Sequence, residues 1–592
     1  MTLPLEVEKK AKNWANSKAF DQETREEISQ LIKNKNEKEI LERFHQELSF
    51  GTGGMRGIVG SGCARVNKYT LRKATKALCL YLKKNYDSKT QLKVGISFDS
   101  RHTSQAFSET VSEVLAYYGI EVYLTKELRP TPLLSFMVRH FSCHAGICIT
   151  ASHNPPNYNG YKVYWADGSQ IVTPHDEGII EEYNLITDYE SLNFLKFGEA
   201  LNKNLIHYCD EELDRVYLEN LKKVSYQQGF ERTQKIVYTP LHGAGVTVLP
   251  QALRQGGFSN VHLVAEQEKP NGSFPTVESP NPEDPKALVL AKKKADEIGA
   301  DLLLATDPDS DRLAFSFRDQ KGDWFDPTGH QQASLLSYYI LSALKEKKRF
   351  PDKPYLVKTI VTTELLDSLA KAYSCECYDT LTGFKWVADV MAKKEKEGAH
   401  YICGGEESFG FLAGSFVRDK DGVGTALVVC EMFSYYQSKG LNFTEVLDQI
   451  YREHGIYCEV AENIELPGKE GLDQINGLMN FFRTEEGKKF FTKDLEFFAD
   501  YEKQEKFSVL ENKKETWDHF VPSNVLSFRF SDYFRLVMRP SGTEAKMKFY
   551  FFHRSDPKWD LKSNSYVSYK KQTEKKLDEF REEFMIKLKT KL

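Results

Sequence analysis

Three times along the chain, short apolar stretches that suit β-strands alternate with amphipathic stretches that have the periodicity of helices. The strand-like stretches are LKVGISF, EVYL and AGICIT in the first series, KIVYTP, VHLVA and ADLLLATD in the second, and YLVKTIV, CECYDT and YICGG in the third. Such alternation favours sheets with substantial parallel pairing and helices on their faces. Functional residues then belong in the loops that follow strands. The pattern therefore predicts three successive α/β units.

The two ends of the chain depart from this alternation. A polar and helical stretch opens the sequence up to about residue 45, and a different order of elements begins at about residue 456. There, EVAENIEL precedes a helical stretch and then NVLSFRFSDYFRLVMRP, which indicates a separate, smaller α+β domain. A chain of 592 residues is long enough for roughly three to five domains. We predict four, at residues 1–205 (N-terminal helix and first α/β unit), 206–326, 327–455 and 456–592.

Composition narrows the class of partner. Hydrophobic residues make up 41% of the chain and charged residues 28%, which is ordinary for a globular protein. The 80 basic and 85 acidic residues leave a net charge of -5, without a long basic run to bind nucleic acid. Charged residues near the start and the lack of a long apolar run favour a cytoplasmic protein without a membrane partner. The 10 cysteines lack metal-type spacing, so we expect reduced, mostly structural thiols.

Ser152 stands in the run TASHNP, directly after the strand-like AGICIT. That position is the carboxyl end of a strand, where open α/β sheets bind ligands. A serine alone is a weak nucleophile, however, and a Ser-Asn-Pro neighbourhood is usually a turn. His153 suits a site or an ordinary loop equally, and Lys162, in the downstream NGYK, can bring an amine back to the same place. Taken alone, this loop favours a structural role.

A second loop, DPDSDR, carries three carboxylates within five residues. Asp307, Asp309 and Asp311 follow the strand-like ADLLLAT, and hard oxygen ligands indicate Mg²⁺ or Ca²⁺. A calcium loop of the EF-hand type needs Gly at its sixth position and Glu at its twelfth, where this chain has Arg312 and Arg318. Mg²⁺ takes its remaining ligands from phosphate and water. The loop therefore predicts a magnesium site beside a phosphate; the alternative, a solvated acidic turn, is weakened by repulsion among the carboxylates.

The third loop, GGEES at residues 404–408, follows the apolar YIC. Glu406 and Ser408 suit hydrogen bonding to sugar hydroxyls, although the same residues also suit the glycine-rich start of a helix. Nearby RDKDG contains Lys420, and TGFK contains Thr382 and Lys385. The cations in both segments suit a phosphorylated ligand, or they lie on ordinary surface turns.

The fourth loop is RPSGTE at residues 539–544, after the strand-like FRLVM. Arg539 supplies a guanidinium, and Ser541 and Thr543 supply hydroxyls. Gly542 lets backbone N–H groups approach a ligand closely. Together they make a phosphate-binding loop, with a plain turn as the alternative.

These four loops, in this order and one per predicted domain, resemble the α-D-phosphohexomutase superfamily, in its phosphoglucomutase and phosphomannomutase branch. The match spans about residues 45–550 and includes FGTGGMRG, DSRHTS and YTPLHG. At Ala545 and in the run Thr328-Gly329-His330, the chain differs from the residues most common in that family. The resemblance implies a heart-shaped, four-domain fold with three related α/β domains and a smaller C-terminal domain, in a monomer or homodimer.

The resemblance also implies roles for single residues. Ser152 would be a phosphoserine, Asp307, Asp309 and Asp311 would bind Mg²⁺ together with a phosphoserine oxygen, and Lys162 would carry protons. Four further residues would shape or neutralise the reacting phosphoryl group: His153, Arg56, Arg312 and Lys385.

Other positions would bind the substrate. Glu406 and Ser408 would hold the 3- and 4-hydroxyls of a sugar, with Thr382 and Lys420 nearby. The phosphate that does not react would be clamped by Arg539, Ser541, Gly542 and Thr543.

The expected activity is a phosphoglucomutase that interconverts glucose 1-phosphate and glucose 6-phosphate through glucose 1,6-bisphosphate. Gly-Glu-Glu-Ser resembles the glucose-preferring form of the sugar loop. Mannose phosphates are the second choice, and phosphopentomutases are also among the longer relatives. A non-catalytic phosphosugar-binding protein is the alternative of a different class, but such a chain is expected to have lost Ser152 or one of the aspartates, and all are present.

Overall fold

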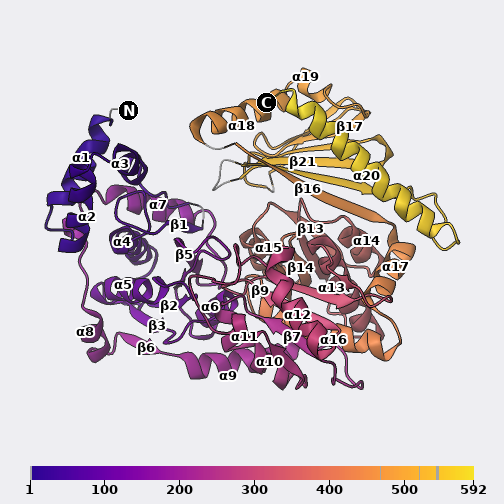
Figure 1. Ribbon diagram of the computed structural model, residues 1–592, viewed down its shortest axis with the longest axis horizontal. Helices are drawn as coiled ribbons and strands as arrows, with labels where there is room; N and C mark the ends of the chain where they lie inside the picture. Colours follow the sequence, from indigo (N-terminus) through magenta and orange to yellow (C-terminus); the bar gives the residue numbers. More distant parts are fainter. Residues whose placement is uncertain (1–2, 52, 467, 519, 542–545, 592) are drawn as a thin grey trace. The chain divides into compact units, whose positions relative to one another are not determined.

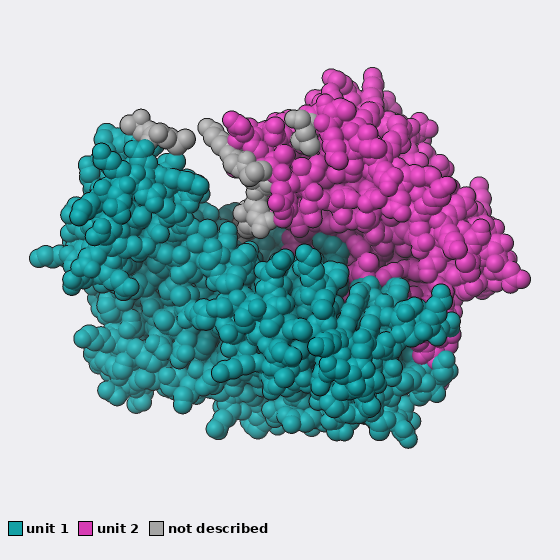
Figure 2. All heavy atoms as spheres, viewed as in Figure 1, with its two compact units in different colours: residues 1–327, 384–440 teal, residues 328–383, 441–592 magenta. Residues whose placement is uncertain are grey.

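The computed structural model describes residues 3–591 apart from residues 52, 467, 519 and 542–545. The chain forms two compact units, coloured separately in Figure 2. Unit 1 contains residues 1–327 and 384–440, and unit 2 contains residues 328–383 and 441–592. The predicted third domain therefore contributes segments to both units. None of the described helices combines the length and the apolarity needed to cross a membrane.

The first sheet of unit 1 has six strands and carries the serine loop (Figure 1). In order across the sheet they are β1 (Gly54–Ile58), β5 (Tyr158–Trp165), β4 (Ala145–Ile149), β2 (Lys93–Phe98), β3 (Glu121–Leu124) and β6 (Ile206–Tyr208). The inner pairs β4–β2, β2–β3 and β3–β6 are parallel, whereas β5 runs antiparallel to both of its neighbours. Strand β6 belongs to this sheet although it lies beyond residue 205.

The central strands β2 and β4 are buried along nearly all of their length because helices pack against the faces of this sheet. The helices of this part of the chain are α4 (Lys68–Asn85), α5 (Ser104–Tyr117), α6 (Thr131–His140), α7 (His175–Leu185), α8 (Phe197–Asn202) and α9 (Asp210–Leu221). The predicted polar opening forms α1 (Leu5–Asn16), α2 (Gln22–Lys33) and α3 (Glu37–Phe44). These three helices enclose a small core around Trp14, Phe20 and Phe44, to which Tyr69 of α4 also belongs.

The second sheet of unit 1 positions the aspartate loop. Its strands are, in order, β11 (Trp324–Phe325), β10 (Leu313–Arg318), β9 (Leu302–Thr306), β7 (Ile236–Thr239) and β8 (Val261–Leu263), with α10 (Leu249–Gln255), α11 (Ala265–Glu268) and α12 (Val289–Ile298) between them in the chain. β7 is parallel to β8 and β9, and β10 returns antiparallel to β9. The turn between β9 and β10 holds residues 307–312.

The remaining segment of unit 1 consists of α15 (Phe384–Lys396), the antiparallel pair β14 (His400–Gly405) and β15 (Phe411–Ala413), and α16 (Gly422–Ser438). Helix α16 is buried along most of its length. The structure corrects one detail of the sequence prediction: Gly404 and Gly405 are the last residues of β14, so the sugar loop begins at Glu406 and leads into a strand, not a helix.

Unit 2 begins with α13 (Gly329–Glu346), β12 (Pro354–Thr359), α14 (Leu365–Ala372), β13 (Glu376–Thr380) and, later in the chain, α17 (Phe443–His454). β12 and β13 are parallel. A seven-stranded antiparallel sheet follows, in the order β16 (Tyr457–Glu465), β22 (Lys546–Arg554), β21 (Phe534–Pro540), β20 (Leu526–Phe530), β17 (Leu495–Asp500), β18 (Glu505–Ser508) and β19 (Lys513–Thr516). It shares an aromatic core with α18 (Gly468–Arg483) and α20 (Tyr566–Lys589), while the short α19 (Glu485–Lys488) lies between α18 and β17 in the chain. The predicted α+β character of this region is confirmed.

Candidate active site

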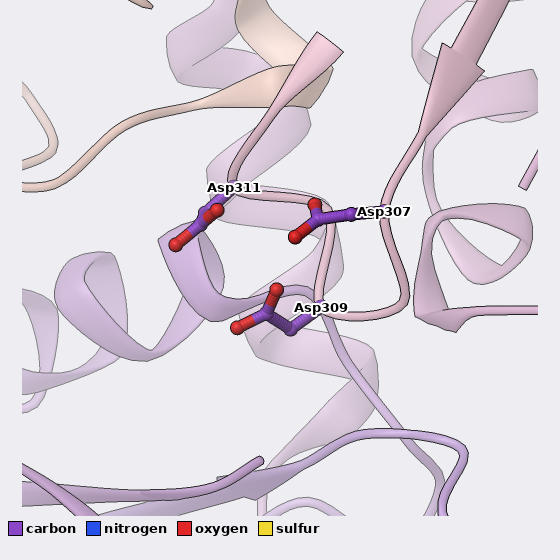
Figure 3. Close-up of side chains that lie close together, drawn as sticks. All are labelled: Asp307, Asp309 and Asp311. Carbon is purple, nitrogen blue, oxygen red and sulfur yellow. The ribbon is translucent and has the colours of Figure 1, made fainter. Parts of the chain in front are cut away.

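Three buried carboxylates lie together in the turn between β9 and β10. Asp307, Asp309 and Asp311 are almost fully buried, and one oxygen from each lies within 4.8 Å of the others. Figure 3 shows their carboxyl groups turned towards one another. Burial, and then the charges of Asp309 and Asp311, raise the pKa of Asp307 well above its ordinary value. A cluster of this kind is not stable as three unpaired anions.

The carboxylates fit a divalent cation. Oδ1 of Asp309 and Oδ1 of Asp311 are buried and have no hydrogen-bond partner among the residues that the structure describes. Buried acceptors without partners are costly, and oxygen ligands of this type are those that Mg²⁺ prefers. The three aspartates therefore form a group that could hold a metal ion.

Ser152 lies against the same cluster. Its backbone has a positive φ of 49°, a strained conformation for a residue with a side chain. Its Oγ donates a hydrogen bond to Oδ2 of Asp307 at 2.7 Å and lies 3.1 Å from Nδ1 of His153. The serine is only 4% exposed. The first and second loops thus meet, although 155 residues separate Ser152 from Asp307.

Arg101 holds the serine loop in place. Its guanidinium donates hydrogen bonds at 2.6–2.9 Å to four carbonyl oxygens, those of Ser152, Asn154 and Pro155 in the loop and that of Tyr158, the first residue of β5. Asp99 pairs with Arg101 at 3.1 Å, and it also accepts from Thr150, whose Oγ1 in turn accepts from the Ser152 amide. The run DSRHTS is recognisable in the sequence, but the sequence alone predicts no role for Asp99 and Arg101. The signal was present, because Asp99 follows the buried strand β2 directly.

Lys162 reaches the cluster from β5. That strand is antiparallel to β4, and the pairing sets Lys162 opposite Cys148, four residues before Ser152. Nζ of Lys162 lies 2.8 Å from Asp309 and 3.5 Å from Asp311. Burial alone would lower the pKa of this lysine, but the two carboxylates outweigh burial and raise it. Lys162 is therefore an ammonium in this arrangement.

Thr131, at the start of α6, fixes Asp309. Its amide donates to the carbonyl oxygen of Asp309 at 2.8 Å, and its Oγ1 donates to Oδ2 at 3.0 Å. These bonds connect the first sheet to the aspartate turn and orient one carboxylate. No local sequence pattern singled out Thr131.

The sugar loop is connected to the cluster through Lys420. Nζ of Lys420 lies 3.1 Å from Asp311, 3.5 Å from Asp419 and 4.0 Å from Glu406. Its stem passes over Gly410, where a Cβ would approach Cδ of Lys420 to 2.1 Å. Ser408 is half-buried in the turn between β14 and β15. Glu406 and Lys420, both proposed from sequence, are thus neighbours.

Two buried tyrosines hold the segment around Lys420. The hydroxyl of Tyr164, on β5, donates to Asp419 at 2.5 Å, and Oδ1 of Asp419 accepts from the Lys420 amide at 2.8 Å. The hydroxyl of Tyr217, on α9, donates to both oxygens of Asp421 at 2.7 and 2.9 Å. Sequence reasoning missed both tyrosines, because their partners lie more than 200 residues away.

Three other candidate residues of unit 1, Arg56, Arg312 and His153, differ in their surroundings. Arg56, on β1, is exposed and donates to the side chain of Asn154 at 2.8 Å. Arg312 donates its amide to Asp307 at 3.2 Å and its guanidinium to Glu283 at 2.5 Å. Burial, followed by the charge of Arg312, lowers the pKa of His153 well below its ordinary value, so its ring is neutral.

Lys385 stands at the start of α15. Burial lowers its pKa to about 8, and the charge of Asp176 opposes that shift only in part. Its Nζ lies 4.8 Å from the ring centre of Trp386. A lysine with this pKa changes charge close to neutral pH.

Within unit 2, Arg539 and Thr382 form a pair, because the guanidinium of Arg539 donates a hydrogen bond to Oγ1 of Thr382. The Ser541 amide donates to the carbonyl oxygen of Lys546 at 2.8 Å. Gly542 and Thr543 lie outside the described residues.

Comparison with known proteins gives three matches to family models of phosphoglucomutase/phosphomannomutase domains. Residues 47–190 match α/β/α domain I, residues 215–321 match domain II, and residues 328–454 match domain III.

Curated relatives cover most of the chain. A phosphoglucomutase of Staphylococcus saprophyticus is 34% identical over 525 residues, which are 88% of this chain and 94% of that protein. A phosphopentomutase of Mus musculus is 32% identical over 554 residues, covering 89% of this chain and 87% of its own. A probable phosphoribomutase of Schizosaccharomyces pombe is 33% identical over 550 residues, covering 90% and 92%.

Solved structures support the fold. A putative phosphomannomutase from Thermus thermophilus has a TM-score of 0.61 at 22% identity, covering 90% of this chain and 99% of its own. The phosphoglucomutase parafusin from Paramecium has a TM-score of 0.60 at 16% identity, covering 88% and 92%.

Proposed function

The chain belongs to the phosphoglucomutase/phosphomannomutase family, and from this premise we propose that it interconverts glucose 1-phosphate and glucose 6-phosphate through a phosphoserine at Ser152. It is an isomerase that acts as an intramolecular phosphotransferase. The observation that carries the mechanism is the hydrogen bond from Ser152 Oγ to Asp307 within a buried carboxylate cluster. The contact supports this assignment, because it sets the hydroxyl of Ser152 beside groups suited to a metal ion.

Asp307, Asp309 and Asp311 would hold Mg²⁺, with an oxygen of phosphorylated Ser152 as a further ligand. Bound there, Mg²⁺ would supply positive charge to the transferring phosphoryl group, whose charge is spread over its oxygens. Thr131 fixes the direction of one carboxylate before any ligand binds.

The transfer step exchanges one P–O bond for another. An oxygen of a sugar hydroxyl attacks the phosphorus on Ser152, the bond from phosphorus to Oγ breaks, and the electron pair stays on Oγ. One proton leaves the sugar hydroxyl and one is gained by Oγ. We assign both transfers to Lys162, whose ammonium lies 2.8 Å from Asp309: it gives a proton to Oγ as the P–O bond breaks, and the resulting amine takes up the proton that the sugar hydroxyl loses. Glucose 1,6-bisphosphate then returns its other phosphoryl group to Ser152 in the reverse of the same step.

The chain orients the nucleophile before the reaction. The strained backbone of Ser152 and the four carbonyl contacts of Arg101 fix the direction of Oγ. Nδ1 of the neutral His153, 3.1 Å away, is a further partner for that oxygen. Such preorganisation avoids the free-energy cost of orienting these groups during the transfer step.

We assign substrate binding to the other candidate residues. Glu406 and Ser408 would bind sugar hydroxyls, with Lys420 and Thr382 as additional donors. Positive charge near the reacting phosphoryl group would come from Arg56, Arg312 and Lys385. The second phosphate would be bound by Arg539, Ser541, Gly542 and Thr543.

Phosphopentomutase activity is a second candidate, because a phosphopentomutase of Mus musculus covers the chain as fully as the staphylococcal phosphoglucomutase and is nearly as similar. Phosphomannomutase activity is a further candidate, which only the membership of the family supports. None of the ten cysteines, all of which lie in the described part of the chain, forms a disulfide, which suits the reducing cytoplasm, where we place the protein. We expect a monomer or a homodimer.

A substrate panel tests the choice of sugar. The purified enzyme with Mg²⁺ and a trace of the matching bisphosphate is assayed on glucose, mannose and ribose 1-phosphates, and kcat/KM is compared. We expect glucose 1-phosphate to give the highest value. A higher value for ribose 1-phosphate would replace the proposed substrate with a pentose phosphate, and turnover of none would favour a binding protein without catalysis.

A further inference from the structure

Unit 2 contains a polar cavity, which none of the proposed substrate residues lines. Its volume is about 350 Å³, within the range of small-molecule sites. The C-terminal end of α17, the end of β22 and the chain after β22 form its walls. The lining residues that carry charge or an aromatic ring include Arg452, His454, Tyr457, Arg554, Trp559 and Lys562.

The cavity is remote from the phosphate loop of the same unit. Strand β22 begins at Lys546, which accepts the hydrogen bond from the Ser541 amide, and ends at Arg554 beside the cavity. Eight residue steps at about 3.3 Å each separate the two ends by roughly 26 Å. A ligand of ordinary metabolite size cannot occupy both places.

Three cations of the cavity have no carboxylate partner within the described part of the chain. The guanidinium of Arg554 lies 4.7 Å from the ring centre of Tyr533. Arg452 lies 3.9 Å from the ring centre of Tyr566 and donates to the carbonyl oxygen of Leu561 at 3.0 Å, which fixes its direction. Lys562 is exposed, and only its amide is bonded, to Asp560 at 3.1 Å.

Two carboxylates also line the cavity, and both have other partners. Asp560 accepts from the Lys562 amide. Glu453 accepts from Nε2 of Gln449 at 3.1 Å and lies 3.7 Å from Nε2 of His454. Three guanidinium or ammonium groups therefore face two carboxylates, which leaves an excess of positive charge even with a neutral histidine.

Neutral donors complete the lining. The hydroxyls of Ser368 and Tyr457 bond to each other at 2.7 Å, so either can turn towards a ligand oxygen. The ring of Trp559, which also lines the cavity, stacks on Tyr569 with centres 4.5 Å apart. Guanidinium, ammonium and hydroxyl donors around one space suit the several acceptor oxygens of a phosphate group.

We propose that this cavity binds the phosphate group of a small molecule, either free phosphate or a phosphate ester. Gly455 lines the cavity, connects α17 to β16 and has a φ of 107° that favours glycine. The amide of the next residue, Ile456, donates to Oγ of Ser555 at 3.1 Å, so the two walls meet at this connection. The inference does not depend on the proposed function, because binding can be measured without turnover.

Fluorine NMR of the full chain labelled with 5-fluorotryptophan tests the proposal. Trp559 reports on the cavity, Trp386 reports on the neighbourhood of Lys385, and Trp559→Phe assigns the first signal. The probes are inorganic phosphate, adenosine 5′-monophosphate, and adenosine as the control without phosphate. The two phosphate probes distinguish the free ion from an ester.

We expect a saturable shift of the Trp559 signal with at least one phosphate probe and none with adenosine. Arg554→Gln with Lys562→Gln should weaken that affinity at least tenfold, and Lys562→Gln alone, an exposed change, should weaken it by a smaller factor. Lys558→Gln, on the same segment but outside the lining, should leave affinity unchanged. An unmoved Trp559 signal at 10 mM of both phosphate probes, or equal affinity in the double variant, would overturn the proposal.

Discussion

The serine and aspartate centre and the turn that follows β14 are held in different ways. Around Asp307, buried side chains bond to partners that lie far away in the sequence, as Thr131 does to Asp309 and Ser152 does to Asp307. In the sugar loop, which follows β14, Ser408 is half-buried, and its side chain has no hydrogen bond within the described residues. We infer that the groups for the transfer step are oriented by the fold, whereas the hydroxyl of Ser408 forms its hydrogen bond only when a sugar arrives.

This contrast separates two kinds of variant. Changes in the buried centre should reduce turnover of every sugar phosphate by a similar factor. Changes in the sugar loop should alter the ratio of kcat/KM between sugar phosphates more than they alter the overall rate.

Replacing Asp309 gives the largest expected effect. Asp309→Ala removes a proposed metal ligand and the partner of Lys162, and we expect kcat to fall by about 10³-fold or more for each sugar. The measurement is turnover at increasing Mg²⁺, together with Mg²⁺ affinity by calorimetry. Turnover within tenfold of the parent enzyme and unchanged Mg²⁺ affinity would show that the metal assignment is wrong.

Tyr164→Phe should have an intermediate effect. It removes the hydrogen bond to Asp419 that positions Lys420, and bonds to charged groups contribute about 1.5–3 kcal/mol, so kcat/KM should fall about 10- to 100-fold. Tyr217→Phe is the matched control, because its partner Asp421 accepts from the Gly424 amide at the start of α16. The control should lower the unfolding temperature more than the rate. Equal rate losses in the two variants would remove the positioning role of Tyr164.

The lowered pKa of Lys385 predicts that kcat/KM depends on pH. Burial lowers its pKa to about 8, so the free enzyme loses this positive charge as pH rises through 8. If the charge binds phosphate, log kcat/KM should fall by about one per pH unit above that value. Lys385→Arg keeps its charge, and the fall should move to higher pH. An unchanged profile in the arginine variant would assign the titration to another group.

Ser408→Ala should give the smallest effect on rate. Loss of one hydroxyl that contacts the sugar only in the complex should cost a few-fold in kcat/KM. The loss should be larger for glucose 1-phosphate than for ribose 1-phosphate, measured side by side, because the furanose ring of ribose has no free 4-hydroxyl. An equal loss for these two sugars would contradict the proposed division between reaction and recognition.

Sequence reasoning succeeded where a feature is local. Strand-like stretches marked the positions after β4 and β9, where Ser152 and Asp307 stand, and the alternation of elements predicted the α/β character. The C-terminal α+β region was also visible, because its strand-like stretches no longer alternate singly with helices.

Sequence reasoning failed where a feature depends on pairing. Nothing local shows that β6 joins the first sheet beside β3, or that Tyr164 reaches Asp419 from β5. Glycines 404 and 405 suggested a loop, but both end a buried strand, because a strand covered on its faces can accommodate small residues. Long-range contacts of this kind depend on tertiary packing, which a single sequence does not display.

Phosphate on Ser152 tests the central claim most directly. The purified chain is incubated with glucose 1,6-bisphosphate, and peptide mass spectrometry locates the added phosphate before and after an excess of glucose 6-phosphate. We expect phosphate on Ser152 that is lost to the sugar, and no turnover by Ser152→Ala. Full activity of Ser152→Ala, or phosphate found only on another residue, would contradict the account.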